Sequence, residues 1–379
     1  RQLSLGELEN KRMDKDKGQN GRRKKQRVLV VGSAEQSAGG VASAIRLMKK
    51  MPVWEEYGCY WLGTQIQRNK LWKLWYAAKA YFIAFLIIWR YDIVHFHTEP
   101  EKSIKTQLPV FMLARLWRKK IILHLHTGNQ LIKEKDNKLA KWCLNRSDLI
   151  ILLAKKWQRL FEESFKDVKT PTAVLYNACE PPAEEINLDS KEPVVFMAAY
   201  FNDNKAPDLL LKAWKGIKDR HPEWRLFMLG NGEVERFKAM AQEMGLSDVE
   251  FTGYIVGKEK EDFFRWASIY CMCSYEEGFP MVVLEAWSHG INVVTTPVGG
   301  LPDVLEEGRN ALTFGFGDWQ GLAAQLERLM DDPVLRKEMA AYSQRFVQER
   351  FSLESISPRL EEIYQSLLKE SRKGISGLR

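Results

Sequence analysis

Two glutamates in the stretch SYEEGFPMVVLEAWSHG, residues 274–290, have the chemical type and spacing to act on one ligand. Glu277 lies in a polar, glycine-containing segment, whereas Glu285 lies within an apolar run that a folded protein would bury. Burying an unpaired carboxylate is costly, so Glu285 requires hydrogen-bonding partners or a shifted pKa. The residues around it indicate what those partners are.

The two glutamates flank the start of an expected helix. Residues 268–274 are typical of a strand, Pro280 suits the first turn of the following helix, and Gly290 suits its end. Amides at such a helix start favour an anion such as phosphate, and two carboxylates beside it would accept hydrogen bonds from sugar hydroxyls. A second interpretation stays open, in which Glu277 is a solvated helix-cap acid and Glu285 pairs with a lysine or arginine.

The longer stretch EEGFPMVVLEAWSHGINVVTTPVGGLPDVLEEGRNAL resembles the signature of glycosyltransferase family 4, the retaining enzymes of the GT-B fold. The matching elements are Glu277-Gly278-Phe279, Glu285-Ala286, Gly290 and Gly299-Gly300-Leu301-Pro302. They occur in the family's order, which makes the match highly specific. The resemblance runs from about residue 27 onward and is strongest over residues 274–312.

The resemblance implies roles for these residues in binding a nucleotide diphosphate sugar. Glu285 would bind the ribose hydroxyls, and Glu277 would act as a catalytic residue beside the transferred sugar. The backbone that faces the sugar and the diphosphate would be that of Gly278, Phe279, Pro280, Met281 and Val282, with Gly299 and Gly300 as further site residues. On this interpretation the bound nucleotide itself buries Glu285.

Phosphate also requires cations, and the segment FMAAYFNDNKAPDLLLKAW contains one. Lys205 stands where the family has a lysine that pairs with the diphosphate and stabilises the leaving group, so it is a catalytic candidate. The family's preceding Gly-Arg is replaced by Ala198-Ala199-Tyr200. The second phosphate cation is therefore absent or comes from elsewhere in the chain. The alternative for Lys205 is a solvated lysine at the start of a helix.

Other candidates lie in the first half of the chain. Gly39 and Gly40 resemble the family's first-domain glycine loop, which approaches the diphosphate or the acceptor; the alternative is a simple turn before a helix. By the same resemblance His97 is a catalytic candidate near the transferred sugar and His126 is a further site residue, although each could be structural. The sequence shows no metal-ligand cluster, and the family works without a metal. No cofactor is expected, with the nucleotide diphosphate sugar as donor substrate.

Alternating strand and helix signals predict the elements that position these residues. Strand signals at residues 27–32, 57–63, 92–97, 120–126, 148–154 and 172–176 form one run, and those at 194–199, 223–230, 249–254, 268–274 and 292–296 form a second. Such alternation indicates two doubly wound α/β domains with parallel sheets, facing a central cleft. We expect a disordered basic leader at 1–26, an acceptor-side domain at 27–185 and a nucleotide-sugar domain at 186–350. Helix 351–379 would cross back to the first domain, with Pro358 bending the chain there.

Composition limits the partners and the compartment. The 379 residues carry a net charge of +8, and five scattered cysteines without a CxxC motif indicate free thiols in a reducing cytoplasm. The apolar segment 80–89 is too short to span a bilayer. Residues 70–90 combine cations with tryptophans, which suits an anionic membrane surface, although a core helix with one wet face is equally open. No nucleic-acid-binding module is visible.

These observations lead to a functional hypothesis. The chain is expected to be a retaining, metal-independent glycosyltransferase that moves a hexose-type sugar to a glycan or lipid-linked acceptor in cell-surface polysaccharide or glycolipid synthesis. It would be cytoplasmic, at the inner face of the plasma membrane. Two alternatives stay open: a degenerate GT-B protein that binds a nucleotide sugar or a partner without turnover, and a nucleotide-sugar epimerase.

Overall fold

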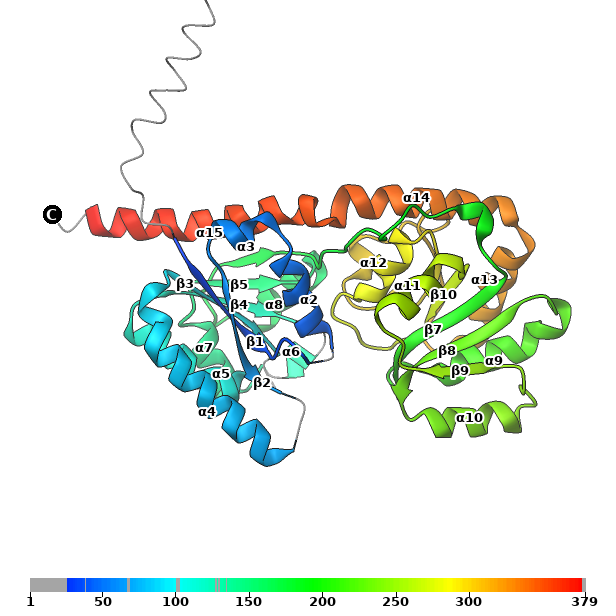
Figure 1. Ribbon diagram of the computed structural model, residues 1–379, viewed down its shortest axis with the longest axis horizontal. Helices are drawn as coiled ribbons and strands as arrows, with labels where there is room; N and C mark the ends of the chain where they lie inside the picture. The colour runs from blue at the N-terminus through cyan, green and yellow to red at the C-terminus, as the bar shows by residue number, and fades with distance from the viewer. Residues whose placement is uncertain are drawn as a thin grey trace, which may run out of the picture.

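The computed structural model describes residues 26–37, 39–66, 69–99, 103–126, 128, 130–133 and 135–376, with backbone alone for 130, 131 and 370–376. The expected leader at 1–26 lies outside this range apart from its last residue. The chain folds into two α/β halves that lie side by side, and long C-terminal helices run along one edge of both (Figure 1).

The first half is built on a six-stranded parallel sheet with the order β2-β1-β3-β4-β5-β6. Its strands are β1 (Val28–Ser33), β2 (Tyr60–Gln65), β3 (Ile93–Thr98), β4 (Lys120–Leu125), β5 (Leu149–Leu152) and β6 (Thr172–Val174). Its helices are α2 (Gly40–Lys49), α3 (Pro52–Glu56), α4 (Lys70–Ile87), η1 (Ile88–Arg90), α5 (Ile104–Leu116), α6 (Gln130–Lys133), α7 (Lys138–Leu144) and α8 (Lys155–Ser164). The strand order reverses at β1, which marks the carboxyl end of this strand as a binding position.

The second half repeats this architecture with the order β12-β11-β10-β7-β8-β9. Its strands are β7 (Val194–Phe201), β8 (Arg225–Gly232), β9 (Glu250–Gly253), β10 (Ile269–Met272), β11 (Asn292–Thr295) and β12 (Ala311–Thr313). Its helices are η2 (Leu188–Ser190), α9 (Pro207–Ile217), η3 (Lys218–Arg220), α10 (Val234–Glu243), α11 (Gly257–Trp266), α12 (Met281–Ser288), η4 (Leu301–Asp303), α13 (Trp319–Asp331) and α14 (Pro333–Phe351). Here the order reverses between β7 and β10.

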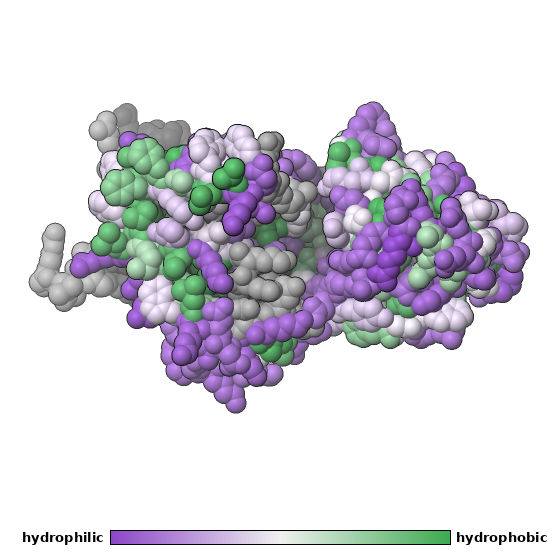
Figure 2. All heavy atoms as spheres, turned by 90° about the horizontal axis from the view of Figure 1, so that it is seen from below, coloured by the Kyte–Doolittle hydropathy of each residue, from purple (hydrophilic) through white to green (hydrophobic). Residues whose placement is uncertain are grey.

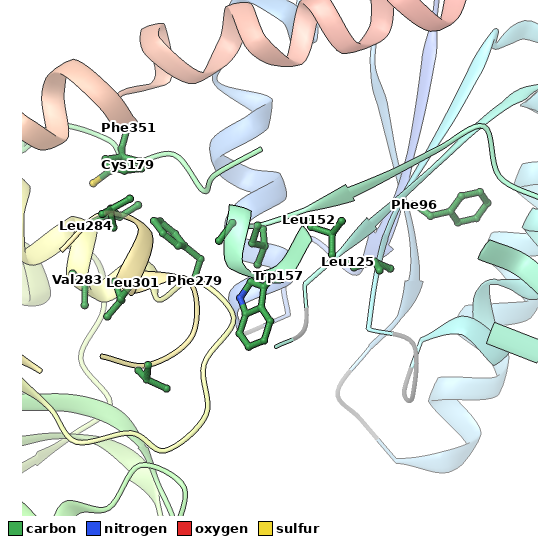
Figure 3. Close-up of a cluster of buried hydrophobic side chains, with 14 of the residues drawn as sticks. Phe96, Leu125, Leu152, Trp157, Cys179, Phe279, Val283, Leu284, Leu301 and Phe351 are labelled. Atoms are coloured by element: carbon green, nitrogen blue, oxygen red, sulfur yellow. The ribbon is translucent and has the colours of Figure 1, made fainter. Parts of the chain in front are cut away.

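The chain crosses between the halves twice, and the two crossings lie side by side. β6 ends at Val174 and β7 begins at Val194, so the boundary expected between residues 185 and 186 falls in the connecting segment. The second crossing is at Ser352, between α14 and α15 (Leu353–Ser376). The backbone N–H of Cys179 donates a 2.7 Å hydrogen bond to the carbonyl of Phe351, and Figure 3 shows these two residues together.

The last helix, α15, packs on the first half as expected of a GT-B fold. Its buried stripe includes Leu360 and Tyr364, which lie in the same core as α2 and α3. The Tyr364 hydroxyl and Nδ1 of His95 are 2.8 Å apart, which adds a polar contact under the helix. The expected bend at Pro358 is wrong: Pro358 lies inside α15, and the chain turns at Ser352 instead because that residue has an extended backbone.

Helix α4 is longer than its apolar centre suggested. With η1 it covers residues 70–90 and is, in the described part of the chain, the one helix long and apolar enough by composition to cross a membrane. It buries the small side chains of Ala77, Ala80 and Ala84 and packs against β2 and α5. The argument that the segment is too short to span a bilayer therefore does not hold, although the helix is part of the first half's packing.

Candidate active site

A cavity of about 700 Å³ lies between the two halves, at the carboxyl ends of both sheets. Its walls come from the loops after β1, β7, β9 and β10 and from the start of α12. The loops after β1, β7 and β10 lie where the two sheets reverse their strand order, which is where open α/β sheets bind ligands. The halves therefore meet around one site.

The start of α12 forms one wall of this cavity. The helix begins at Met281 with Pro280 as its N-cap, so Pro280 lies just before the first turn and not within it. No side chain caps this end and the first turn contains no acidic residue, which leaves its amides and the helix dipole for an anion. The helix ends at Ser288, and the left-handed Gly290 that was expected to stop it follows the C-cap residue His289. The predicted residues that line the cavity here are Gly278, Phe279, Pro280, Met281 and Val282.

Lys205 and Glu277 form an ion pair in the wall of the cavity. The ammonium Nζ of Lys205 donates a hydrogen bond to Oε1 of Glu277, and their side chains are 24% and 14% exposed. The loop that holds Lys205 is fixed by Asn202, whose side-chain oxygen accepts a 3.1 Å hydrogen bond from the Lys205 N–H. The structure thus brings together two of the three residues predicted as catalytic, Lys205 and Glu277.

Glu285 also lines the cavity, and its partner is a lysine that the sequence did not reveal. Nζ of Lys260, on α11, donates a 2.7 Å hydrogen bond to Oε2 of Glu285. Both side chains are about one third exposed, at 33% and 32%, so the carboxylate is not sealed in an apolar core. Lys260 stands in the charged run KEKE, which is typical of any solvent-exposed helix, and for that reason no pattern pointed to it.

Tyr200 belongs to the segment Ala198-Ala199-Tyr200, which stands where the family has Gly-Arg. It lines the cavity and is 60% exposed. Among the described residues of the cavity wall, the cations are Lys205 and Lys260 and the carboxylates are Glu99, Glu277 and Glu285. Within the described part of the wall, these two lysines are therefore the candidates for binding phosphate.

Gly299 and Gly300 do not line the cavity but support the loop that carries Glu277. Gly299 has a φ of +63°, and a Cβ atom there would lie 2.7 Å from the carbonyl oxygens of Glu277 and Gly278. The N–H of Gly300 donates a 2.8 Å hydrogen bond to the carbonyl of Gly278. The Gly-Gly pair is required because the backbone passes directly beneath this loop.

The glycine loop of the first half reaches the cavity from the opposite side. Gly39 and Gly40 both line it, and a Cβ atom at either would meet nothing within 4 Å. Gly39 has a φ of +113° and is the N-cap of α2, which has no side-chain cap. The first half therefore also presents an uncapped helix start to the ligand.

Four histidines lie on one face of the first sheet, with their rings stacked against one another: His95, His97, His124 and His126. The ring centroids of neighbouring pairs are 4.4–5.5 Å apart, and Nδ1 of His97 lies 2.8 Å from Nε2 of His126. His126 lines the cavity, whereas His97 lies behind it and does not. Of the two predicted histidines, the structure therefore places His126 at the cavity wall and His97 behind it.

Burial keeps these imidazoles neutral. It lowers the pKa of His126 to about 4, and burial together with the neighbouring imidazoles lowers the pKa values of His95, His97 and His124 well below the usual range. At neutral pH, His126 is thus a neutral hydrogen-bonding group at the cavity wall and not a phosphate-binding cation.

The histidine cluster corrects the expectation that metal-ligating residues do not gather. The ring nitrogens of His95, His97 and His124 lie within 4.8 Å of one another, and in the described structure four of their nitrogens lack a partner. Tetrahedral zinc with bonds of about 2.0–2.1 Å brings its ligand atoms to roughly 3.4 Å from each other. The cluster is wider than that and would require rearrangement to hold a metal.

Fold and site together define a class of protein. Two parallel α/β domains facing a cavity, with uncapped helix starts, two lysines and paired carboxylates, have the GT-B architecture and suit an anionic ligand rich in hydroxyls.

Comparison with known proteins agrees with this class. Residues 182–346 match the family described as "Glycosyl transferases group 1". D-inositol 3-phosphate glycosyltransferase of Corynebacterium jeikeium is 26% identical over 75% of this chain and 74% of its own length. N-acetyl-alpha-D-glucosaminyl L-malate synthase of Bacillus anthracis is 24% identical over 75% and 77%. The crystal structure of Anabaena HepE in complex with UDP-glucose matches with a TM-score of 0.70 at 18% identity, covering 89% of this chain and 99% of that one. The second half of the chain thus matches the group 1 glycosyl transferases, and these comparisons agree with the resemblance to family 4.

Proposed function

We propose that the protein transfers a hexose-type sugar from a nucleotide diphosphate sugar to an acceptor with retention of configuration and without a metal. The observation that carries this proposal is the convergence of Lys205, Glu277, Glu285 and the uncapped start of α12 on one cavity. Each group suits one part of such a donor: amides and ammonium for the diphosphate, and carboxylates for hydroxyls.

The chemistry follows from these positions. The α12 amides and Lys205 stabilise the negative charge that grows on the diphosphate as its bond to the sugar C1 breaks. Glu285 accepts hydrogen bonds from the ribose hydroxyls, and Glu277 and His126 orient the sugar. In front-face attack the acceptor hydroxyl bonds to C1 on the side from which the diphosphate leaves. Its proton passes to a diphosphate oxygen, so no separate protein base is required.

A second candidate function is binding without turnover, because Ala198-Ala199-Tyr200 stands where the family has Gly-Arg. Epimerisation of the nucleotide sugar is a third, and it would yield an altered donor in the absence of any acceptor. Incubation with UDP-, GDP- and ADP-linked hexoses, followed by nucleotide release and product NMR, separates the three. Transfer predicts released nucleotide and a product with the donor's anomeric configuration, unaffected by EDTA. Binding without release would overturn the proposal, and UDP-glucose is the first donor to test because the HepE structure contains it.

The acceptor is proposed to be lipid-linked and the enzyme to sit on an anionic membrane. The apolar patch consists of exposed residues on α4, η1 and the end of α5: Leu71, Trp72, Leu74, Trp75, Phe82, Phe85, Leu86, Trp89, Met112, Leu116 and Trp117. Figure 2 shows apolar side chains gathered on the half that carries α4, whereas the other half is mostly hydrophilic from this side. Such exposure marks an interaction surface.

Charge supports the proposal that a lipid surface covers the apolar patch. Residues 70–90 contain no acidic side chain, and three exposed lysines and one exposed arginine interleave with the tryptophans. Lys79 lies over the Trp75 ring at 5.4 Å and Arg90 over the Trp89 ring at 5.1 Å. Cations beside aromatic rings suit the headgroup region of an anionic membrane. This arrangement supports work at the inner face of the plasma membrane, on glycolipid or cell-surface polysaccharide precursors.

Liposome flotation tests this surface. The protein is expected to float with anionic vesicles and less with neutral ones, and added salt should weaken the attachment. Replacing Trp75 and Trp89 by serine should release it, whereas Val334→Ser, which changes an exposed residue on the other half, should not. If the wild type floats with neither vesicle, the acceptor is soluble and the membrane proposal is wrong.

A further inference from the structure

The cavity has few cations for a ligand that carries a diphosphate. Its described wall contains two lysines against three glutamates, and Lys205 is already held by Glu277. The helix start supplies only partial charge. Tyr200 contributes a phenol in the segment where the family has Gly-Arg, and not a cation. In the described wall, the remaining candidate for a second phosphate-binding cation is Lys260, which is paired with Glu285.

Lys260 lies where that cation is needed. Glu285 is four residues after Met281, and helical side chains lean toward the helix N-terminus, so its carboxylate lies over the first turn of α12. The Lys260 ammonium, 2.7 Å from this carboxylate, is therefore next to the uncapped amides. It also lies 5.2 Å from the centre of the Phe264 ring, a contact that favours a cation at this position.

We propose that Lys260 is the second phosphate-binding cation of this site and that it reaches the diphosphate by leaving Glu285. The inference rests on the proposed function, because it takes the ligand of the cavity to be a nucleoside diphosphate. Before binding, Lys260 neutralises Glu285. When the ribose hydroxyls donate to Glu285, the ammonium turns to a phosphate oxygen, so both charges have partners in either state.

The energetics permit this exchange. An ion pair that is one third exposed contributes little net stability, so it can be broken at small cost. Lysine suits the role because its ammonium is a point charge on a flexible stem, whereas an arginine would form a two-pronged pair that holds the carboxylate. In this proposal Lys260 supplies the second phosphate-binding cation that the segment around Tyr200 lacks.

The test compares binding of a nucleoside diphosphate with binding of the same nucleoside. Wild type is first titrated with UDP, GDP and ADP by calorimetry, and the nucleoside of the diphosphate that binds is then followed by NMR. In Lys260→Met the diphosphate should bind about 10- to 100-fold more weakly, because a charge-assisted contact is lost. Nucleoside affinity should stay within about twofold of wild type. Lys258→Met is the matched control: it lies on the same helix, pairs with Asp262 and is absent from the cavity wall.

The outcomes separate this inference from the proposed function. Loss confined to the diphosphate supports Lys260 as a phosphate cation. An unchanged diphosphate affinity overturns the assignment of Lys260 as a phosphate cation. An equal loss of affinity for diphosphate and nucleoside also overturns it, because that result means that Lys260 only orients Glu285. Wild type that binds none of the three diphosphates would instead overturn the proposed function. Thermal unfolding of both variants checks that each is folded, and Lys260→Gln repeats the measurement if the methionine variant is not.

Discussion

The indole Nε1 of Trp157 donates a 2.8 Å hydrogen bond to the carbonyl of Gly278, which joins the two halves of the molecule next to Glu277. Trp157 belongs to α8 of the first half, and Figure 3 shows its ring directed at the loop before α12. The same carbonyl accepts the Gly300 N–H from within the second half. The loop that carries Glu277 is therefore held from both sides, and its position depends on how the halves are closed.

Trp157→Phe is expected to reduce turnover while leaving the fold intact. Phenylalanine keeps a smaller aromatic ring in this buried position but loses one hydrogen bond of about 1 kcal/mol, which corresponds to a roughly fivefold decrease in kcat if the bond positions Glu277. Steady-state kinetics measures it, with Trp142→Phe on α7 as control because Trp142 does not line the cavity. A wild-type kcat in the variant would mean that the loop is positioned without this contact.

Glu285→Gln should weaken nucleoside binding by about 1–3 kcal/mol, because the ribose loses a charged acceptor. The nucleoside is the better ligand for this test because it has no phosphate. With a diphosphate, Lys260 freed from residue 285 would bind the phosphate, and this gain would hide the loss of affinity at the ribose. Ligand-observed NMR gives the affinity, and Glu259→Gln, an exposed glutamate on α11, is the control. Equal affinities for the variant and the wild type would exclude the ribose role.

Most of the fold could be predicted because both halves obey strong local rules. The fully buried run before Ser33 and the alternation of strands with helices indicated parallel sheets, and the structure has each expected strand within a few residues. The missed strand, β12, is three residues long and carries too little pattern to be seen. The bend assigned to Pro358 was wrong because Pro358 lies inside α15, and the chain turns at the extended Ser352 before this helix begins.

The site residues were predictable where they are adjacent in sequence, and less so where only tertiary packing determines which residues reach the cavity. The segment from Glu277 to Glu285 lines one cavity as expected, since one loop and one helix carry it. Lys260 could not be identified, because only the packing of α11 beside α12 brings it to Glu285. His97 and His126 share a face of the sheet, and which of them reaches the cavity depends on where the strands end, which sequence defines poorly.

The buried histidines should make stability fall as the pH is lowered. Their folded pKa values lie below the ordinary 6.5, and that of His126 is about 4, so the unfolded chain binds more protons between these values. Stability is then complete above about pH 6.5 and is lost as pH falls toward 4, at up to about 1.4 kcal/mol per pH unit for each histidine. Urea unfolding from pH 7.5 to 5.0 measures it. His124→Leu should show a shallower loss than wild type, and parallel curves would contradict the assignment.

The last prediction concerns α15, which belongs to the second half by sequence and to the first by packing. Leu360 is fully buried in the core shared with α2 and α3, so Leu360→Ala should cost about 2–5 kcal/mol of unfolding free energy, whereas Leu116→Ala, 76% exposed, should cost little.

A chain ending at Arg350 should expose that core, bind a hydrophobic dye and lose transfer, because the first half no longer has α15 as its cover. Nucleotide binding should partly survive, since Lys205, Lys260 and Glu285 all lie on the second half and none belongs to the α15 core. If the shortened chain stays free of dye and keeps full transfer activity, α15 is an appendage and the tether between the halves lies elsewhere.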